Sequence, residues 1–225
     1  MKFIKKYWRI LCAGYVFIYL PWFFTLEHIN TIDSPRMHII NVPLDYKIPF
    51  CEYFIIPYIL WFFYIVASCI YMYFKADNSE FARLAVSLIA GMSISMFICM
   101  IYPNGITLRP DYIPDNFFGR IVSGLYATDT STNVFPSIHC YNSMAVHIAL
   151  CKCKAMKNAK HHRLVLSLSL VLCISIILST MFLKQHSVVD VIGAFILMAV
   201  MYIVVYAVDW KNVMSRRKTS ANAAR

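Results

Sequence analysis

Charged residues are scarce in this chain. They make up 14% of its 225 residues, whereas hydrophobic residues make up 60%. A soluble domain usually contains about 25% charged and about 45–50% apolar residues. The low charge therefore excludes an ordinary soluble enzyme, a disordered chain and a coiled coil. Such a composition is suited to lipid as the solvent, so we expect a membrane protein.

Internal repeats, low-complexity tracts and linkers are also absent, so we expect one integral membrane domain over residues 1–225. The eight cysteines lie mostly inside apolar runs, which does not predict a disulfide framework. Cys151 and Cys153 form one C-x-C pair without a second pair, which is only a weak indication of zinc. Thiols that are buried or face lipid are the simpler interpretation.

Six apolar stretches approach the ~20 residues that a membrane-spanning helix needs. They are residues 10–26, 54–74, 81–102, 138–150, 164–183 and 188–208. The fourth reaches this length only if residues 151–156 continue the helix and Lys152 and Lys154 extend toward the headgroups. The first follows a basic N-terminus without a small-residue cleavage site, which favours a retained helix over a removed signal peptide. The predicted fold class is all-α, a bundle of six transmembrane helices.

The basic residues are distributed unevenly among the predicted loops. With the N-terminus inside, 16 of the 21 Lys and Arg residues lie in segments 1–9, 75–83, 151–163 and 209–225. The positive-inside rule then places both termini in the cytoplasm. The net charge of +10 is thus a sign of topology, and we expect no nucleic acid partner. We expect a multi-pass protein of the plasma membrane.

Segment 27–52 differs from the apolar stretches. It contains Pro35, Pro43 and Pro49 among alternating apolar and polar residues. Three prolines exclude a single helix. We expect this segment to cover the outer surface of the bundle, at the interface or as a re-entrant cap.

Polar residues near membrane depth are costly and are therefore candidates for function. They gather on the predicted outer side around Arg109 and in segments 136–139 and 184–190. His186 and Asp190 are four residues apart at a helix start, so they share one face. A carboxylate that binds one ring nitrogen fixes the tautomer and makes the other nitrogen a better nucleophile or base. A histidine at an ordinary helix cap would show the same spacing.

Segment 136–139 predicts a helix start, because a proline and a serine precede an apolar run. The free N–H groups of such a first turn attract an anion, and His139 stands beside them. Arg109 is suited to hold phosphate oxygens with its planar guanidinium, although a structural arginine at headgroup level would look the same. Two histidines, a carboxylate, an arginine and a helix N-terminus are together the groups needed for phosphoryl transfer through a phosphohistidine.

These segments resemble the motifs of the type 2 phosphatidic acid phosphatase superfamily, which shares its core with vanadium haloperoxidases. That family has the motifs K-x6-R-P, P-S-G-H and S-R-x5-H-x3-D. The corresponding segments here are residues 102–110, 136–139 and 179–190, in the same order. The spacing inside the first and third motifs fits without a gap. The motif-bearing half covers about residues 100–195.

The resemblance implies a role for each matching residue. His186 would attack the phosphorus, Asp190 would orient His186, and His139 would protonate the leaving group and later activate the acceptor. Arg109, Ser137 and the backbone N–H near Ile138 would hold the phosphate. The resemblance implies neither a metal nor another cofactor, and the sequence contains no cluster of carboxylates that would suggest one.

Three positions depart from the family motifs. Tyr102 stands in place of lysine, Thr180 in place of arginine, and Ile138 in place of glycine. Two cationic phosphate ligands are therefore missing. Lys184 is the candidate to supply one of these charges, although as a point charge and not as a planar fork. The residues expected around the phosphate are Arg109, Ser137, Ile138, Lys184, Tyr102 and Thr180.

Fewer cations hold a dianionic phosphomonoester less tightly, whereas a phosphodiester carries one charge less. The reduced basic set resembles inositol phosphorylceramide synthase and sphingomyelin synthase, and residues 43–45 resemble a short motif of the latter. We expect first a membrane phosphatase that hydrolyses a lipid phosphomonoester or pyrophosphate. The alternatives are a lipid phosphotransferase and a catalytically inactive lipid-binding relative.

Overall fold

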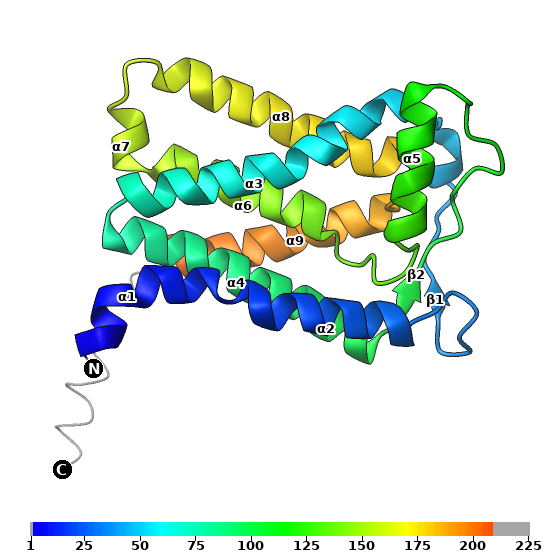
Figure 1. Cartoon of the computed structure of the whole chain (residues 1–225), viewed down its shortest axis with the longest axis horizontal. Coiled ribbons are helices and arrows are strands. Elements are labelled where there is room, and N and C mark those ends of the chain that lie inside the picture. Colours follow the sequence, from blue (N-terminus) through cyan, green and yellow to red (C-terminus); the bar gives the residue numbers. More distant parts are fainter. Residues whose placement is uncertain (1, 209–225) are drawn as a thin grey trace, which may run out of the picture.

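The computed structural model describes residues 2–208, and most of them lie in helices that run side by side (Figure 1). The predicted inner segment 209–225 lies outside the described residues. The longer helices are α2 (Val16–Ile29), α3 (Ile55–Lys75), α4 (Asn78–Ile101), α6 (Ile138–Lys152), α8 (His162–Phe182) and α9 (Val188–Tyr202). The shorter elements are α1 (Lys2–Ala13), α5 (Phe117–Thr128), α7 (Lys154–Lys157), two 3-10 turns (Asp45–Lys47, Glu52–Phe54) and a π-helical turn (Ile203–Ala207).

Five helical segments are long and apolar enough to cross a membrane. They are Tyr7–Ile29, Glu52–Lys75, Asn78–Ile101, His162–Phe182 and Val188–Ala207. They confirm the expectation of an all-α membrane bundle, and each corresponds to one of the predicted stretches. The remaining stretch is α6, which has 15 residues and falls short of the ~20 that a crossing needs. A sixth crossing therefore stays a prediction.

Helix α6 includes residues 151 and 152 but not residues 153–156, so the condition under which the fourth stretch would reach spanning length is not met. The C-terminal neighbour of α6, Cys153, has an extended backbone (ψ 121°), and α7 is a separate turn. Contacts with the start of α4 explain why the helix ends here. The Lys154 N–H donates to Glu80 Oε1 at 2.9 Å, and Lys154 Nζ donates to Asp77 Oδ2 at 3.1 Å. These bonds draw the chain toward the start of α4. Although α6 is short, it occupies the centre of the bundle and packs against α3, α4, α8 and α9.

The first apolar stretch is not one continuous helix either. Helices α1 and α2 are separated at Gly14 and Tyr15. The Tyr15 N–H donates to the Cys12 carbonyl, and the Phe17 N–H to that of Gly14, so the usual i−4 pattern tightens here to i−3. Glycine is a weak helix former, which explains why the interruption falls at this position.

Segment 27–52 forms no single helix, which confirms that expectation, and it gathers at one end of the bundle (Figure 1). Its strand β1 (His38–Ile39) pairs in parallel with β2 (Asn104–Gly105), which follows α4. The Cys51 N–H donates to the Phe182 carbonyl at the end of α8. Helix α5 lies at the same end, while α1 lies at the opposite end (Figure 1). The three polar segments thus meet at one end of the molecule.

Candidate active site

Two histidines that are 47 residues apart in the sequence face each other at this end. His139 lies in the first turn of α6, and His186 immediately precedes α9. His139 Nδ1 lies 3.3 Å from His186 Nε2, and the two rings meet edge to face with centroids 5.5 Å apart. The structure therefore brings together the two imidazoles that the sequence singled out.

Asp190 holds the other side of the His186 ring. Its Oδ2 lies 3.2 Å from His186 Nδ1 and also accepts the Ser187 N–H at 2.8 Å. The second bond belongs to a capping box in which Ser187 and Asp190 satisfy each other's backbone at the start of α9. With Nδ1 bound to the carboxylate, Nε2 carries the lone pair and faces His139.

Asp45 fixes the start of α9 from outside, and sequence reasoning did not assign it to the site. Its Oδ2 accepts the Ser187 hydroxyl at 2.7 Å, and its Oδ1 accepts the Val188 N–H at 2.8 Å. The side chain is buried. The positive end of α9 is thus neutralised by a carboxylate and leaves no room there for a substrate phosphate.

The start of α6 has a different environment. Ser137 is its N-cap, and its Oγ accepts the Cys140 N–H at 3.4 Å. The Ser137 N–H donates to the Asp190 carbonyl at 3.2 Å, which ties α6 to α9. Ile138 and His139 belong to the first turn, whose N–H groups have no acceptor within the helix, and both line a small cavity. An anion in that cavity would meet these groups.

His139 is positioned by aromatic rings. Its ring centroid lies 4.7 Å from that of Tyr58 and 4.3 Å from that of Trp61, both on α3. A carboxylate orients His186, whereas aromatic side chains and His186 itself orient His139. The two histidines are therefore chemically different, which suits one as nucleophile and the other as proton donor.

Arg109 reaches this site through Gln185. Its Nη2 donates to Gln185 Oε1 at 2.9 Å and to the Asp129 carbonyl, and its Nη1 donates to the Tyr126 carbonyl at 2.9 Å. The guanidinium also stacks over the Tyr126 ring at 4.2 Å. Burial lowers the pKa of Arg109 and raises the pKa of Tyr126 to about 12, but at neutral pH arginine stays charged and tyrosine neutral.

The other three expected phosphate ligands lie elsewhere. Lys184 Nζ donates to the carbonyls of Asp45 and Ile48 at 2.6 and 2.5 Å, and burial lowers its pKa. The Tyr102 ring stacks on His38 with centroids 4.2 Å apart. The buried Thr180 hydroxyl donates to the Ile177 carbonyl within α8. None of the three lines the cavity beside the histidines.

Two carboxylates form part of the wall of the cavity beside the histidines. This cavity of about 40 Å³ is lined by Glu27 and Asp129 as well as by Gln185. Glu27 accepts the Asn133 amide at 2.7 Å and the Thr130 hydroxyl. The cavity shares Glu27, Thr130 and Thr132 with a larger one of about 450 Å³, which also reaches Arg109. Sequence reasoning missed Glu27, whose only signal was a charge at the end of an apolar run.

No metal site accompanies these groups in residues 2–208, where no three His, Cys, Asp or Glu side chains gather in a way that could hold an ion. The eight cysteines are free thiols. The groups that face the cavity are imidazoles, carboxylates, amides and hydroxyls. They are suited to proton transfer, nucleophilic attack and hydrogen bonding.

Comparison with known proteins agrees with the resemblance noted in the sequence. A search of curated proteins and a search of solved structures gave no match. The family model described as PAP2 superfamily matches residues 80–214, which is more than half of the chain. The matched region contains Arg109 and the segments of both histidines. The chain therefore belongs to the PAP2 superfamily.

Proposed function

We propose that this protein is an integral membrane lipid phosphatase that hydrolyses a phosphomonoester or pyrophosphate through a phosphohistidine. The observation that carries this proposal is the series Asp190–His186–His139, with contacts of 3.2 and 3.3 Å. It joins an oriented nucleophile to a second proton-carrying group. The membership in the PAP2 superfamily supports the same class of reaction.

The first step forms a bond between His186 Nε2 and phosphorus and breaks the bond from phosphorus to the lipid oxygen. His139 gives its proton to that oxygen, and the lipid leaves as an alcohol from a phosphomonoester or as a lipid monophosphate from a pyrophosphate. Asp190 stabilises the positive charge on the His186 ring. For this step the phosphate has to enter between the two rings, in place of their mutual hydrogen bond.

The second step returns the enzyme to its starting state. Water attacks the phosphorus of the phosphohistidine, and His139 takes its proton as a general base. The bond between phosphorus and Nε2 breaks, and inorganic phosphate is released. The N–H groups of Ile138 and His139 would hold phosphate oxygens in both steps. Ser137 would hold this turn in place as its N-cap, and Arg109 would add its charge through Gln185.

The test is phosphate release from a panel of purified lipids in detergent. The panel includes phosphatidate, an isoprenyl pyrophosphate and a sphingoid phosphate. We expect release by the wild type and none by His186→Ala, while His139→Ala is slower by about 10²–10⁴-fold. His147→Ala is the matched control, because His147 lies two turns further along α6 and bonds to Ser169 instead. Substantial release by His186→Ala would contradict the assignment of the nucleophile.

The second candidate function is a lipid phosphotransferase, in which a lipid hydroxyl replaces water. The observation that favours it is the charge of the site, where Glu27 and Asp129 line the cavity and Lys184 is bound elsewhere. A phosphodiester donor needs less positive charge than a monoester. Phosphoenzyme that decays only after addition of diacylglycerol or ceramide would favour the transferase, whereas equal decay without the alcohol supports the phosphatase.

We further propose that the site faces the extracytoplasmic side of the plasma membrane and that both termini are cytoplasmic. The excess of Lys and Arg in the predicted inner segments supports this orientation. The site lies at the end of the bundle opposite to α1, which is consistent with it (Figure 1). Alkylation of Cys51 in intact cells by an impermeant maleimide is the expected result, with Cys151, a partly exposed thiol at the other end, labelled only after the cells are opened.

A further inference from the structure

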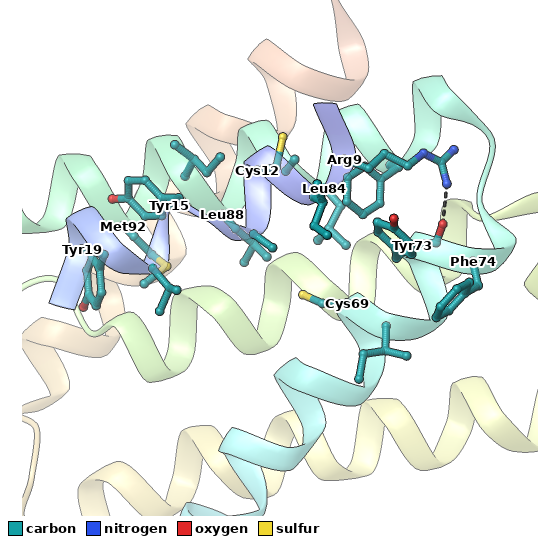
Figure 2. Close-up of a pocket in the computed structure, with 17 residues that line it drawn as sticks. Arg9, Cys12, Tyr15, Tyr19, Cys69, Tyr73, Phe74, Leu84, Leu88 and Met92 are labelled. Atoms are coloured by element: carbon teal, nitrogen blue, oxygen red, sulfur yellow. Dashed lines mark hydrogen bonds between the residues drawn. The ribbon is translucent and has the colours of Figure 1, made fainter. Parts of the chain in front are cut away.

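An apolar cavity of about 440 Å³ lies between α1, α2, α3 and α4 (Figure 2), and neither His139 nor His186 lines it. Tyr15 lines it just before α2, Tyr19 from α2, Cys69 from α3, and Leu88 and Met92 from α4. Its volume falls within the range of about 300–1,000 Å³ that is usual for ligand pockets. The lining consists mostly of hydrocarbon side chains and aromatic rings, so its natural occupant is a hydrocarbon.

One end of this cavity is closed by Arg9. Its guanidinium donates to the Tyr73 and Ala76 carbonyls and to Asn78 Oδ1, which fastens α1 to the connection between α3 and α4. Figure 2 shows the bond from Arg9 to the Tyr73 carbonyl. The guanidinium also lies over the Phe81 ring at 5.1 Å. A lipid headgroup therefore finds no free positive charge at this end, and a chain is blocked from entering along the helix axes.

The other end of this cavity is the end nearer to the candidate active site, and a row of side chains on one face of α2 runs from one to the other. Tyr15, Tyr19, Phe23 and Glu27 follow one another at four-residue spacing, so they line up on that face. Neighbouring aromatic rings in this row lie about 6 Å apart, with centroids at 6.0 and 6.1 Å. Tyr19 lines the apolar cavity, whereas Phe23 and Glu27 line the cavity beside the histidines.

The position of the cavity along α1 and α2 sets the length of chain that could reach it. Tyr19 is eight residues from Glu27, and Arg9 is eighteen residues from it. Along α2, at ~1.5 Å per residue, Tyr19 lies about 12 Å and Val16 about 17 Å from Glu27, and the lining continues past the break at Tyr15 to Arg9 on α1. The middle of a bilayer lies about 15 Å from its interface, so most of the cavity lies beyond it. A lipid with its phosphate at His186 fills the cavity only if its chain passes the middle of the bilayer.

We propose that this cavity binds the distal part of the substrate's hydrocarbon chain, and that the enzyme thereby selects lipid phosphates with one very long chain. The inference rests on the proposed function, since the phosphate is taken to bind between His139 and His186. A hydrocarbon chain that enters the cavity exchanges contacts with lipid for contacts with protein. The favourable free energy of binding therefore comes from closer packing and from alignment of the phosphate with the histidines. The selectivity is accordingly moderate.

The test compares two phosphatidates in detergent, the dioctanoyl lipid and one with a tetracosanoyl chain. We expect the wild type to prefer the long chain, measured as the ratio of kcat/KM values. Cys69→Trp fills the cavity and should lower this ratio by about tenfold, which corresponds to ~1.4 kcal/mol. Val66→Trp is the matched control, because Val66 lies one turn earlier on α3, is exposed and does not line the cavity. An unchanged ratio in an active Cys69→Trp variant overturns the proposal.

A second measurement does not require turnover or a bulky substitution. In the inactive His186→Ala protein, we expect the long-chain phosphatidate to slow alkylation of Cys12 and Cys69, which line the cavity, and to leave Cys151 unaffected. Equal alkylation with both phosphatidates overturns the proposal. Equal protection by a phosphatidylcholine of the same chain length also overturns it, because the cavity then holds any bilayer lipid. If the wild type hydrolyses neither phosphatidate, the proposed function has failed, and the alkylation result alone decides on the cavity.

Discussion

Helices α4 and α9 begin with the same local motif, a capping box, but in opposite surroundings. At α4 the box joins Asp77 and Glu80, with bonds of 2.8 and 3.0 Å between side chains and backbone N–H groups. At α9 it joins Ser187 and Asp190. The Asp77 side chain is 45% exposed, whereas that of Asp190 is fully buried.

The difference lies in what each carboxylate binds besides its own helix. Asp77 forms an exposed ion pair with Lys154, an interaction that is usually worth little. Asp190 binds the His186 ring, and the same turn is bound from outside by Asp45. The capping box of α4 only starts its helix, whereas the capping box of α9 also sets the orientation of His186. Burial decides between the two uses, because a buried carboxylate must find partners.

The largest effect is expected where the α9 box is altered. Asp190→Asn keeps the size of the side chain but removes the charge that fixes the His186 tautomer and stabilises the charged ring. We expect kcat for phosphate release to fall by about 10⁴-fold, as for the aspartate of a catalytic triad. Glu80→Gln makes the matching change in the α4 box and should leave kcat unchanged. If the Asp190→Asn enzyme kept nearly wild-type turnover, the α9 capping box would have no more catalytic importance than the α4 capping box.

The next effect concerns the bonds that reach α9 from segment 27–52. Asp45→Ala leaves the Ser187 hydroxyl and the Val188 N–H without their acceptor in a buried place. We expect the free energy of unfolding to fall by about 1–3 kcal/mol, measured as a lower Tm in detergent. Asp33→Ala, at an exposed aspartate of the same segment, serves as control. Equal Tm values for the two variants would show that the α9 turn does not depend on Asp45.

A smaller effect is expected at the α4 box itself. Glu80→Ala removes the acceptor for the N–H groups of Asp77 and Lys154, so α4 loses a cap and the junction of α6 and α7 loosens. We expect a loss of about 1 kcal/mol or less in the free energy of unfolding, because water can replace the carboxylate at this exposed place. Phosphate release at a permissive temperature should be unaffected. A loss of activity would imply that this end is coupled to the histidines.

The smallest effect is a dependence on pH. The bond from the Glu80 N–H, followed by that from Lys154, lowers the pKa of Asp77 below its ordinary value of 3.8. The ionised form thus stabilises the fold fully above that value, and this contribution is lost as the pH falls through the lowered pKa. The Tm difference between wild type and Asp77→Asn should be present at pH 6 and shrink as the pH falls below 3.8. A Tm difference that stayed constant with pH would show that the effect comes from packing and not from the charge of Asp77.

The local features of this molecule could be predicted from the sequence. Apolar stretches became helices, Ser137 became an N-cap, and His186 and Asp190 share one face because their spacing fits a helix start. The polar segments met at one end of the bundle because the apolar stretches between them are nearly as long as the bundle. These are consequences of periodicity and of the membrane's thickness.

Contacts between distant parts of the chain were not predictable in this way. Nothing near Lys154 in the sequence shows that its N–H will bond to Glu80, and this bond ends α6. Lys184 has a positive φ of 53°, and its amine reaches carbonyls that lie more than 130 residues earlier. Whether a lysine near a histidine meets the phosphate or the backbone depends on which loop folds against it. A single sequence does not specify that choice.

The bond from Asp45 to the start of α9 also has a consequence for the two halves of the chain. The region that matches the family model, residues 80–214, contains both histidines but lacks Asp45. In a fragment of that region, the Ser187 hydroxyl and the Val188 N–H would lose their acceptor, and the Val188 N–H would be open to an anion. The fragment would then offer an anion two helix starts at which to bind. Of these, the start of α6 lines the cavity beside His186. Asp45, in the N-terminal part of the chain, thus prevents unproductive binding of phosphate at the start of α9.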